Sequence, residues 1–260
     1  MSGMARPEVL LEDDHLLVLD KPAGMVVHPS YKNKTGTLLD ALQAREWPAE
    51  TRPSIVGRLD KLTSGIVVVA KSAAMHAALQ RHLASGASEK TYLAIVYGRV
   101  SEERGTIDLR LRHDPKDRRI IVVHDINAPD GAAASGGRVS ATEFERLSSV
   151  EAPDAGLSLL RCRLVTGRRH QIRVHLAARG WPIVGDPQYG EPRWSRVVDP
   201  ALAAALEQFP RQALHAWRVA FDHPVTRQRV TIEAPLPRDL AELMELARLK
   251  PRATATTAGA

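Results

Sequence analysis

Cysteine is almost absent from this chain, which has one, Cys162, among its 260 residues. A single thiol excludes an internal disulfide and a thiolate-rich zinc site. We therefore expect Cys162 to be a small residue inside a strand. Aromatic residues are also scarce, at 4% of the sequence. The core must rest on aliphatic side chains, and each tyrosine is worth examining as a candidate for function.

Long hydrophobic runs are missing as well. The aliphatic runs are short, as at residues 66–70, and residues 1–14 contain no apolar stretch of the kind found in signal peptides. We therefore expect a soluble, cytoplasmic protein. The 44% of hydrophobic residues is typical of a globular chain that buries a core. Because no coiled coil or apolar surface stripe is evident, we expect a monomer without an obligate protein partner.

Positive charge is present but unevenly distributed. The net charge is +6, and residues 161–185 alone supply it, because this window holds six arginines and no acidic residue. These arginines are Arg161, Arg163, Arg168, Arg169, Arg173 and Arg179. A concentrated basic segment is typical of a protein that binds a polyanion such as nucleic acid. A solvated basic face is an equally good interpretation of charge alone.

The pattern of apolar residues predicts strands in pairs with helices between them. Strands are expected at residues 10–20, 66–70, 90–100, 106–112, 119–123, 139–147, 157–165, 213–221 and 227–233. Helices are expected at residues 37–47, 72–84, 168–179, 200–208 and 238–249. This order lacks regular strand–helix–strand alternation. It indicates an α+β fold with one domain around a mixed, largely antiparallel sheet with flanking helices.

A charged turn holds Asp60 directly before the aliphatic strand 66–70. A buried strand is rigid, so the turn before it can hold a carboxylate in one place. Arg58 and Lys61 flank Asp60, and nearby cations favour an ionised carboxylate. Asp60 is therefore a candidate nucleophile. The alternative is an ordinary turn with a solvated aspartate.

The predicted helix 168–179 concentrates basic side chains at its start. A helix N-terminus attracts phosphate. Arg169 and Arg173 are four residues apart, so they would share a face, and Arg173 could reach a carboxylate beside the core. His170 and His175 are five residues apart, roughly 140° around a helix at roughly 100° per residue. This spacing does not suit a zinc pair, and we expect no metal.

Tyr92 lies near the start of the predicted strand 90–100. An aromatic ring there can stack on a nucleobase, a contact worth roughly 1–3 kcal/mol. Packing against a neighbour within the sheet is the alternative. The sequence contains neither a glycine-rich phosphate loop nor the serine elbow of a hydrolase.

Six segments in order resemble the RluA-type pseudouridine synthases, which isomerise uridine in structured RNA. They are residues 21–29, 58–65, 89–92, 167–175, 185–190 and 214–237. The resemblance runs from about Leu10 to Leu240, nearly the whole chain. It implies a pseudouridine synthase catalytic domain at residues 10–249, with an extension at 1–9 and a disordered tail at 250–260. The family usually carries histidine where this chain has Gly57, a change that makes the turn more flexible.

The resemblance also implies roles for individual residues. Asp60 would be the essential carboxylate, attacking the ribose or assisting cleavage through a glycal. Tyr92 would stack under the uracil, Arg173 would pair with Asp60, and Arg58 would fill the space left by the extruded base. RNA phosphates would be held by Arg168, Arg169, Lys116, Arg118 and Arg119. The reaction involves no redox step and so needs no cofactor.

The resemblance favours an enzyme acting on ribosomal or transfer RNA, at a stem-loop or bulge. The family pattern begins by residue 10, which leaves no room for a separate N-terminal RNA-binding domain. We therefore expect the catalytic domain's own surface to select the RNA. Two other functions stay open: a non-catalytic RNA-binding or folding factor with the same fold, and a metal-dependent nuclease using Asp60 and His170.

Overall fold

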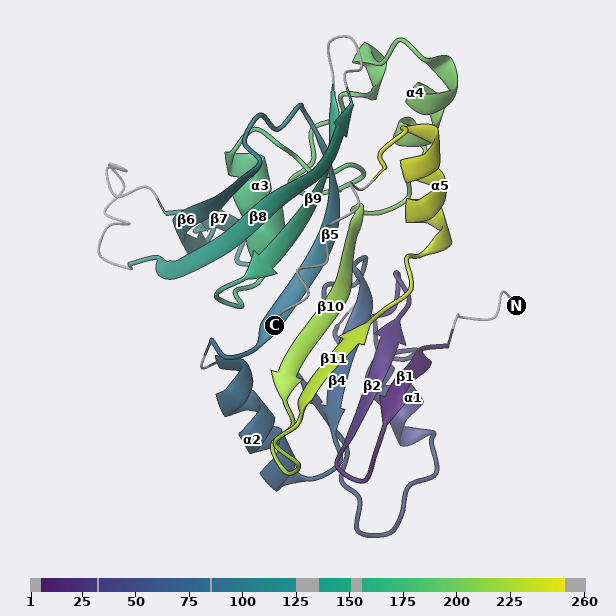
Figure 1. Ribbon diagram of the computed structural model, residues 1–260, viewed down its shortest axis with the longest axis vertical. Coiled ribbons are helices and arrows are strands. Elements are labelled where there is room, and N and C mark those ends of the chain that lie inside the picture. Colours follow the sequence, from purple (N-terminus) through teal and green to yellow (C-terminus); the bar gives the residue numbers. More distant parts are fainter. Residues whose placement is uncertain (1–5, 32, 85, 125–135, 151–155, 251–260) are drawn as a thin grey trace, which may run out of the picture. The chain divides into compact units, whose positions relative to one another are not determined.

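The computed structural model describes residues 6–31, 33–84, 86–124, 136–150 and 156–250. The chain divides into two compact units (Figure 1). The first unit consists of Met1–Tyr92 and Leu214–Pro237, and the second of Leu93–Ala213 and Arg238–Ala260. Strand β5 (Glu89–Tyr97) begins in the first unit and ends in the second. The α+β class with a mixed, largely antiparallel sheet is confirmed, whereas the predicted domain limits stay a prediction.

In the first unit, the strands follow the order β1 (Glu8–Glu12), β2 (Leu16–Lys21), β4 (Ser64–Ala70) and β10 (Leu214–Asp222). Strand β3 (Ser54–Val56) pairs with β4, and β11 (Arg229–Glu233) pairs with β10. All these pairs are antiparallel except β4 with β10. Because β10 pairs with the start of β4 and β3 with its end, two strands share one edge of β4.

Strand β4 is buried on both faces, as its continuous aliphatic sequence predicts. On one face, Ile66 and Val68 pack in a cluster with Leu79 of helix α2 (Ala73–Ala84). On the other face, Val67 and Val69 pack in a cluster with helix α1 (Leu38–Gln43). The rigid base expected beneath the Asp60 turn is therefore present.

The caps of both helices agree with the sequence. Thr37 and Asp40 form a reciprocal capping box at the start of α1, and the Ser72 hydroxyl accepts a hydrogen bond from the Met75 N–H at the start of α2. The predicted single strand 10–20 was wrong, because the chain reverses after Glu12 and forms β1 and β2. The Asp13 carboxylate accepts the N–H groups of His15 and Leu16 and closes this turn.

In the second unit, β5, β9 (Leu157–Leu164), β8 (Arg138–Val150), β6 (Arg104–His113) and β7 (Ile121–Val123) follow one another across the sheet. Its helices are α3 (Gln171–Ala178), the short 3-10 helix Trp194–Arg196, α4 (Pro200–Glu207) and α5 (Arg238–Leu246). Val174 of α3 packs against Leu111 and Ile121 of the sheet. This contact fixes the helix that carries Arg173.

Helix α3 begins later than predicted. His170 has a left-handed backbone conformation, with φ of 54°, and the helix starts only at Gln171. Arg168 and Arg169 therefore precede the helix, and the prediction that Arg169 and Arg173 share a helical face was wrong. The tail 251–260 and most of a glycine-rich stretch before β8 lie outside the described residues. No helix of the described part is long and apolar enough to cross a bilayer.

Candidate active site

Asp60 lies in the turn between β3 and β4, and hydrogen bonds from several directions hold this turn. The Asp60 carbonyl accepts the Thr63 N–H at 3.2 Å. The next carbonyl, that of Lys61, accepts the Gly24 N–H at 2.8 Å. The turn that follows β2 is thereby bonded to the turn that carries Asp60. Two segments of the predicted family pattern thus meet at the turn that carries the candidate carboxylate. Lys21 and Lys61, one from each segment, are 40 residues apart in the sequence.

Lys21 strengthens this junction from inside. Its side chain is fully buried, and its ammonium donates hydrogen bonds to the carbonyls of Pro22 and Met25, each at 2.9 Å, and of Lys61 at 3.3 Å. Buried charges need such compensation. The sequence placed Lys21 in the family pattern without indicating this role, because nothing in the sequence marks a lysine as buried.

The start of β4 is tied to β10 on its other side. The Ser64 hydroxyl and Nδ1 of the buried His215 are 3.0 Å apart. The next residue, Gly65, approaches Ala216 so closely that a Cβ atom would lie 2.3 Å from the Ala216 carbonyl oxygen. Only glycine permits this contact. The Asp60 turn is thus followed by a strand whose first residues have little freedom to move.

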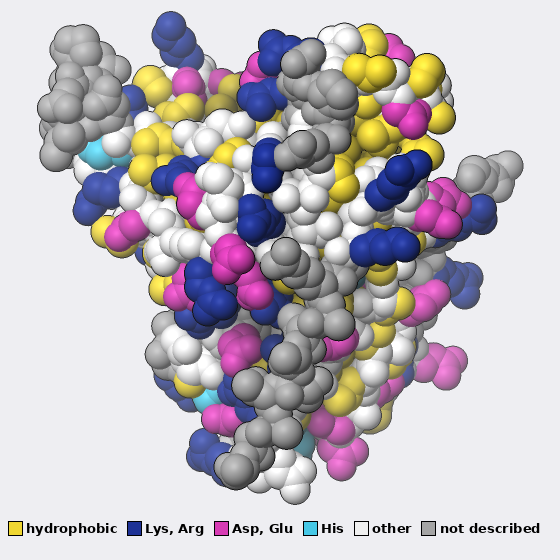
Figure 2. Space-filling view, turned by 45° about the horizontal axis from the view of Figure 1, so that its top comes forward, with side chains coloured by type: hydrophobic (Ala, Val, Ile, Leu, Met, Phe, Trp, Pro, Cys, Tyr) yellow, Lys and Arg dark blue, Asp and Glu magenta, His cyan; other side chains and the backbone are white. Residues whose placement is uncertain are grey.

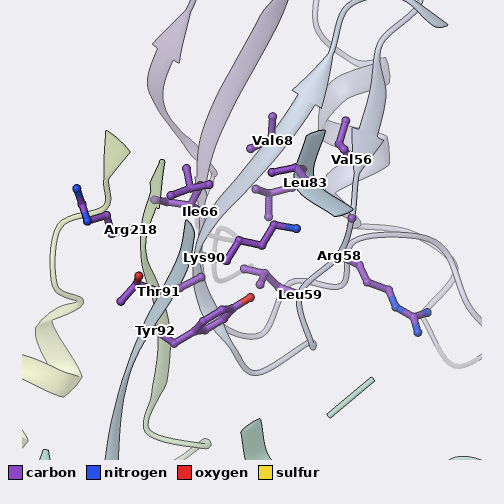
Figure 3. A pocket seen from close by; sticks show the side chains of 14 residues that line it. Val56, Arg58, Leu59, Ile66, Val68, Leu83, Lys90, Thr91, Tyr92 and Arg218 are labelled. Atoms are coloured by element: carbon purple, nitrogen blue, oxygen red, sulfur yellow. The ribbon is translucent and has the colours of Figure 1, made fainter. Parts of the chain in front are cut away.

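A pocket opens beside the turn, where β3 and β10 part along β4 (Figure 3). Its empty space, counted together with the solvent at its open mouth, is about 460 Å³. Its lining residues are Val56, Gly57, Arg58, Leu59, Ile66, Val67, Val68, Leu83, Lys90, Thr91, Tyr92, Ala216, Arg218 and Val219. All belong to the first unit, as does Asp60.

Tyr92 lies at the pocket beside Leu59, the residue before Asp60 (Figure 3). Burial raises the pKa of the Tyr92 phenol, and the negative charge of Asp60 raises it further. The phenol therefore stays neutral, and its ring lies within electrostatic reach of the Asp60 carboxylate. The structure brings together these two predicted site residues, a carboxylate and an aromatic platform.

Arg58 is exposed and points away from the pocket in Figure 3. The residue before it, Gly57, has φ of +85°, which favours glycine, although a side chain there would meet open space. The departure from the family's usual histidine thus coincides with a backbone conformation that suits glycine.

Arg173 reaches a buried carboxylate, which is that of Asp186. Its guanidinium donates to both Asp186 oxygens, at 2.7 and 2.8 Å, and lies 4.9 Å from the Tyr189 ring centre. Burial alone would raise the pKa of Asp186, but the Arg173 hydrogen bonds and charge hold it below its usual value. Sequence reasoning missed Asp186 as a partner. Asp60 lies in the other unit, and its pairing with Arg173 stays a prediction.

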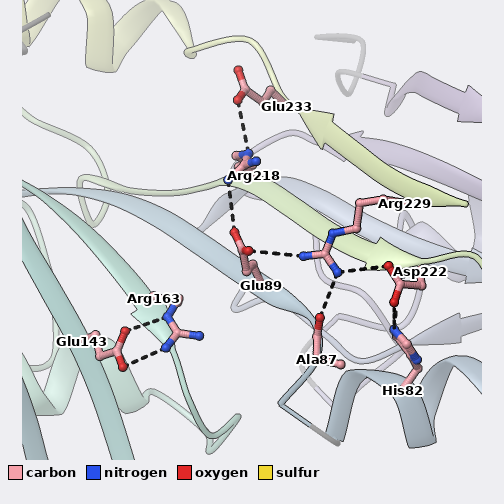
Figure 4. Close-up of polar contacts among 9 residues, drawn as sticks. All are labelled: His82, Ala87, Glu89, Glu143, Arg163, Arg218, Asp222, Arg229 and Glu233. Atoms are coloured by element: carbon pink, nitrogen blue, oxygen red, sulfur yellow. Dashed lines mark hydrogen bonds and ion pairs between the residues drawn. The ribbon is translucent and has the colours of Figure 1, made fainter. Parts of the chain in front are cut away.

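Ion pairs engage most of the arginines in the basic segment that the sequence predicted. Four of its six arginines bind acidic side chains within the second unit: Arg161 with Glu145, Arg163 with Glu143, Arg173 with Asp186 and Arg179 with Glu102. Figure 4 shows the Arg163 pair, and Figure 2 shows basic and acidic side chains interspersed over the visible face. The arginines remaining at the segment's centre are Arg168 and Arg169, both exposed.

The predicted phosphate-binding loop lies near one of these two arginines, Arg169. Hydrogen bonds from Arg119, with a smaller contribution from the charge of Arg169, lower the pKa of Asp117 to about 2. Arg169 is therefore close to the loop that also carries Lys116 and Arg118, whose side chains are exposed. The Arg168 guanidinium donates to the Val139 carbonyl at 3.3 Å. Arg169 thus lies near the loop, in which Asp117 partly neutralises Arg119, and the phosphate-binding role of all five residues stays a prediction.

Among the residues that the structure describes, no group of three or more His, Cys, Asp or Glu side chains is arranged to hold a metal ion. The first unit contributes a held carboxylate and an aromatic ring beside a pocket, and the second unit carries two exposed arginines. These features suit a protein that binds a nucleotide and a polyanion.

Comparison with known proteins gives the family. Residues 15–178 match the RNA pseudouridylate synthase family. The chain is 40% identical over 250 residues to the ribosomal large subunit pseudouridine synthase D of Nitrosomonas europaea, covering 95% of this chain and 67% of that protein. It is 42% identical over 243 residues to the protein of that name from Xanthomonas campestris, covering 92% and 69%.

The fold agrees with this similarity. The solved structure of human RNA pseudouridylate synthase domain containing 4 superimposes with a TM-score of 0.71 at 22% identity, covering 94% of each chain. The chain belongs to the RNA pseudouridylate synthase family. It is an RNA pseudouridine synthase, an isomerase that acts on RNA.

Proposed function

We propose that the chain converts uridine to pseudouridine in ribosomal RNA, with Asp60 as the essential carboxylate. The observation that carries this proposal is the position of Asp60 near the Tyr92 ring, in a turn fixed by Lys21 and Gly24. The curated relatives compared above are named for the ribosomal large subunit, which favours ribosomal over transfer RNA as substrate. Such an enzyme would act in the cytoplasm, as a monomer.

The reaction moves one bond and leaves the composition of the RNA unchanged. The bond between uracil N1 and ribose C1′ breaks, the base turns, and C5 bonds to C1′. The proton of C5 is lost and N1 gains one. Asp60 either attacks C1′ or promotes cleavage through a glycal, and Tyr92 keeps the freed uracil stacked at the site. Arg173 pairs with Asp60 and keeps its carboxylate ionised and oriented.

The uridine must first leave its stack, at a cost of a few kcal/mol. The exposed Arg58 guanidinium is planar and replaces the extruded base in the stack. The surface that carries Arg168, Arg169 and residues 116–119 holds phosphates, which gives affinity without reading sequence. A loop or bulge suits this mode of binding, because its bases unstack readily.

The test compares Asp60→Asn with Asp14→Asn, a matched change at an exposed aspartate of the same unit. Asp60→Asn is expected to abolish tritium release from 5-tritiated uridine in ribosomal RNA while the affinity for that RNA persists. Asp14→Asn should retain both. Near-normal tritium release by Asp60→Asn would end the proposal. RNA binding without tritium release by the natural protein would instead indicate a non-catalytic RNA-binding factor.

A further inference from the structure

Lys90 extends into an apolar part of the pocket beside Tyr92. Figure 3 shows the Lys90 and Tyr92 side chains on the same side of β5 and Thr91 on the other, as strand alternation requires. The walls around the Lys90 stem include Ile66, Val68 and Leu83. An ammonium group is rarely placed in such surroundings unless a partner compensates it.

The described chain supplies no such partner. Among the described residues, none accepts a hydrogen bond from the Lys90 ammonium or forms an ion pair with it. The neighbouring carboxylate of Glu89 is already bound by Arg218 and Arg229, each at 3.2 Å (Figure 4). Burial lowers the pKa of Lys90 below its ordinary value. The ammonium is thus a set of three donors without an acceptor, in a pocket open to a ligand.

The spacing of Lys90 and Tyr92 suits a pyrimidine ring. Two residues on one face of a strand are about 7 Å apart. A ring stacked on Tyr92 would present its edge within reach of the long lysine side chain. Uracil carries carbonyl acceptors on that edge, whereas cytosine carries an amino donor in place of the carbonyl at C4. An ammonium, which only donates, favours the first and repels the second.

We propose that Lys90 is a specificity residue, whose ammonium donates a hydrogen bond to the C4 carbonyl of the target uracil stacked on Tyr92. This inference rests on the proposed function, because it takes a uridine in RNA as the ligand. It also explains why the chain keeps an uncompensated cation in an apolar pocket: the acceptor arrives with the substrate.

A double-mutant cycle tests the contact. The protein is compared with Lys90→Met, both carrying Asp60→Asn so that only binding is measured. The ligands are two RNAs, one with uridine at the target position and one with 2-pyrimidinone riboside, which lacks the C4 oxygen. Lys90→Met is expected to weaken binding of the uridine RNA roughly 10- to 100-fold, the effect of a hydrogen bond to a charged group. Binding of the 2-pyrimidinone RNA should hardly change.

Two controls separate this role from others. Lys34→Met removes an exposed lysine of the same unit, and it should affect both RNAs equally and weakly. Thermal unfolding of Lys90→Met should occur at the natural temperature or higher, because an unpaired, half-buried charge is replaced by an apolar chain of similar length. If that variant unfolds instead, Lys90→Arg, which keeps donors in the pocket, is used for the same cycle and should retain the preference for uridine.

Equal loss of affinity for both RNAs would overturn the proposal and assign Lys90 to a phosphate. Unchanged affinity, or a preference for uridine that no Lys90 variant alters, would also overturn it. The outcome is independent of the chemistry proposed for Asp60. The natural protein's tritium release tests that chemistry separately, and the binding cycle can be measured even if no pseudouridine forms.

Discussion

The ammonium of Lys21 lies 3.3 Å from the carbonyl oxygen of Lys61, the residue after Asp60. The same ammonium binds two carbonyls of its own turn, at Pro22 and Met25. One buried cation thus joins the two turns that frame the candidate carboxylate, through hydrogen bonds to backbone carbonyls of both turns. The position of Asp60 therefore depends on a residue that lies far from it in sequence.

Replacing Lys21 with Met should loosen this junction. The change leaves three carbonyls without the ammonium, and the free energy of unfolding should fall by about 2–4 kcal/mol because buried acceptors lose a charged donor. The turnover number should fall while the KM for RNA stays near normal, because phosphate contacts lie elsewhere. Urea unfolding and steady-state tritium release measure the two effects. A Lys34→Met protein, changed at an exposed lysine, should match the natural one, and equal behaviour of both variants would contradict the prediction.

Gly65 and Gly57 should respond differently to substitution by alanine. At Gly65 the new methyl group would meet the Ala216 backbone at 2.3 Å, so β4 and β10 must separate. We expect a loss of more than about 3 kcal/mol of stability or failure to fold. At Gly57 the space is open and only the positive φ is costly, by about 1–2 kcal/mol. Thermal unfolding of the two variants side by side measures both losses of stability. Similar losses for the two variants would contradict the prediction.

Local patterns in the sequence were sufficient where a structure depends on neighbouring residues. The aliphatic run 66–70 predicted β4, and Thr37 predicted the start of α1. Local patterns failed where a single backbone angle determines the start of an element. His170 has a left-handed conformation, and α3 therefore begins after it, at Gln171. The turn at Asp13 was missed for a similar reason. Hydrogen bonds to the Asp13 carboxylate reverse the chain there, where the apolar pattern predicted one continuous strand.

The candidate site was predictable only in part. Asp60 and Tyr92 were identified by family resemblance, and the structure places them near each other. The partner of Arg173 was not predictable, because Asp186 is 13 residues away across a turn. The surroundings of the buried Lys21 and the half-buried Lys90 were not predictable either, because no sequence pattern distinguishes such lysines from surface ones. Tertiary packing, which no short pattern encodes, decides each of these cases.

The buried pair of Arg173 and Asp186 should be sensitive to the loss of either charge. Their side chains are 6% and 0% exposed, and Asp186→Asn would remove the carboxylate charge that the buried guanidinium binds within its own unit. We expect a loss of about 3–5 kcal/mol in stability. Asp117→Asn, which breaks the exposed pair with Arg119, is the matched control and should unfold like the natural protein. Chemical denaturation of both variants measures the difference, and an Asp186→Asn protein as stable as the natural one would contradict the prediction.

His175 should make the protein sensitive to acid. It is fully buried in α3, and burial lowers its pKa to about 4. The Ser140 hydroxyl donates to the Leu109 carbonyl at 2.6 Å, so His175 Nε2, 2.9 Å from that hydroxyl, carries the proton of a neutral ring. Between pH 6.5 and 4 the unfolded chain binds a proton that the folded chain excludes. Stability therefore falls as the pH is lowered through this window, by up to about 3 kcal/mol.

Replacing His175 with Gln removes this titration, so the slope of unfolding free energy against pH should flatten between pH 6.5 and 4, even if the variant is less stable at neutral pH. His113→Gln, at an exposed position in the same unit, should leave the slope unchanged. Urea unfolding at half-unit steps of pH measures both slopes. Because the linkage depends on the difference in bound protons and not on absolute stability, a His175→Gln protein with the natural slope would mean that another group excludes the proton.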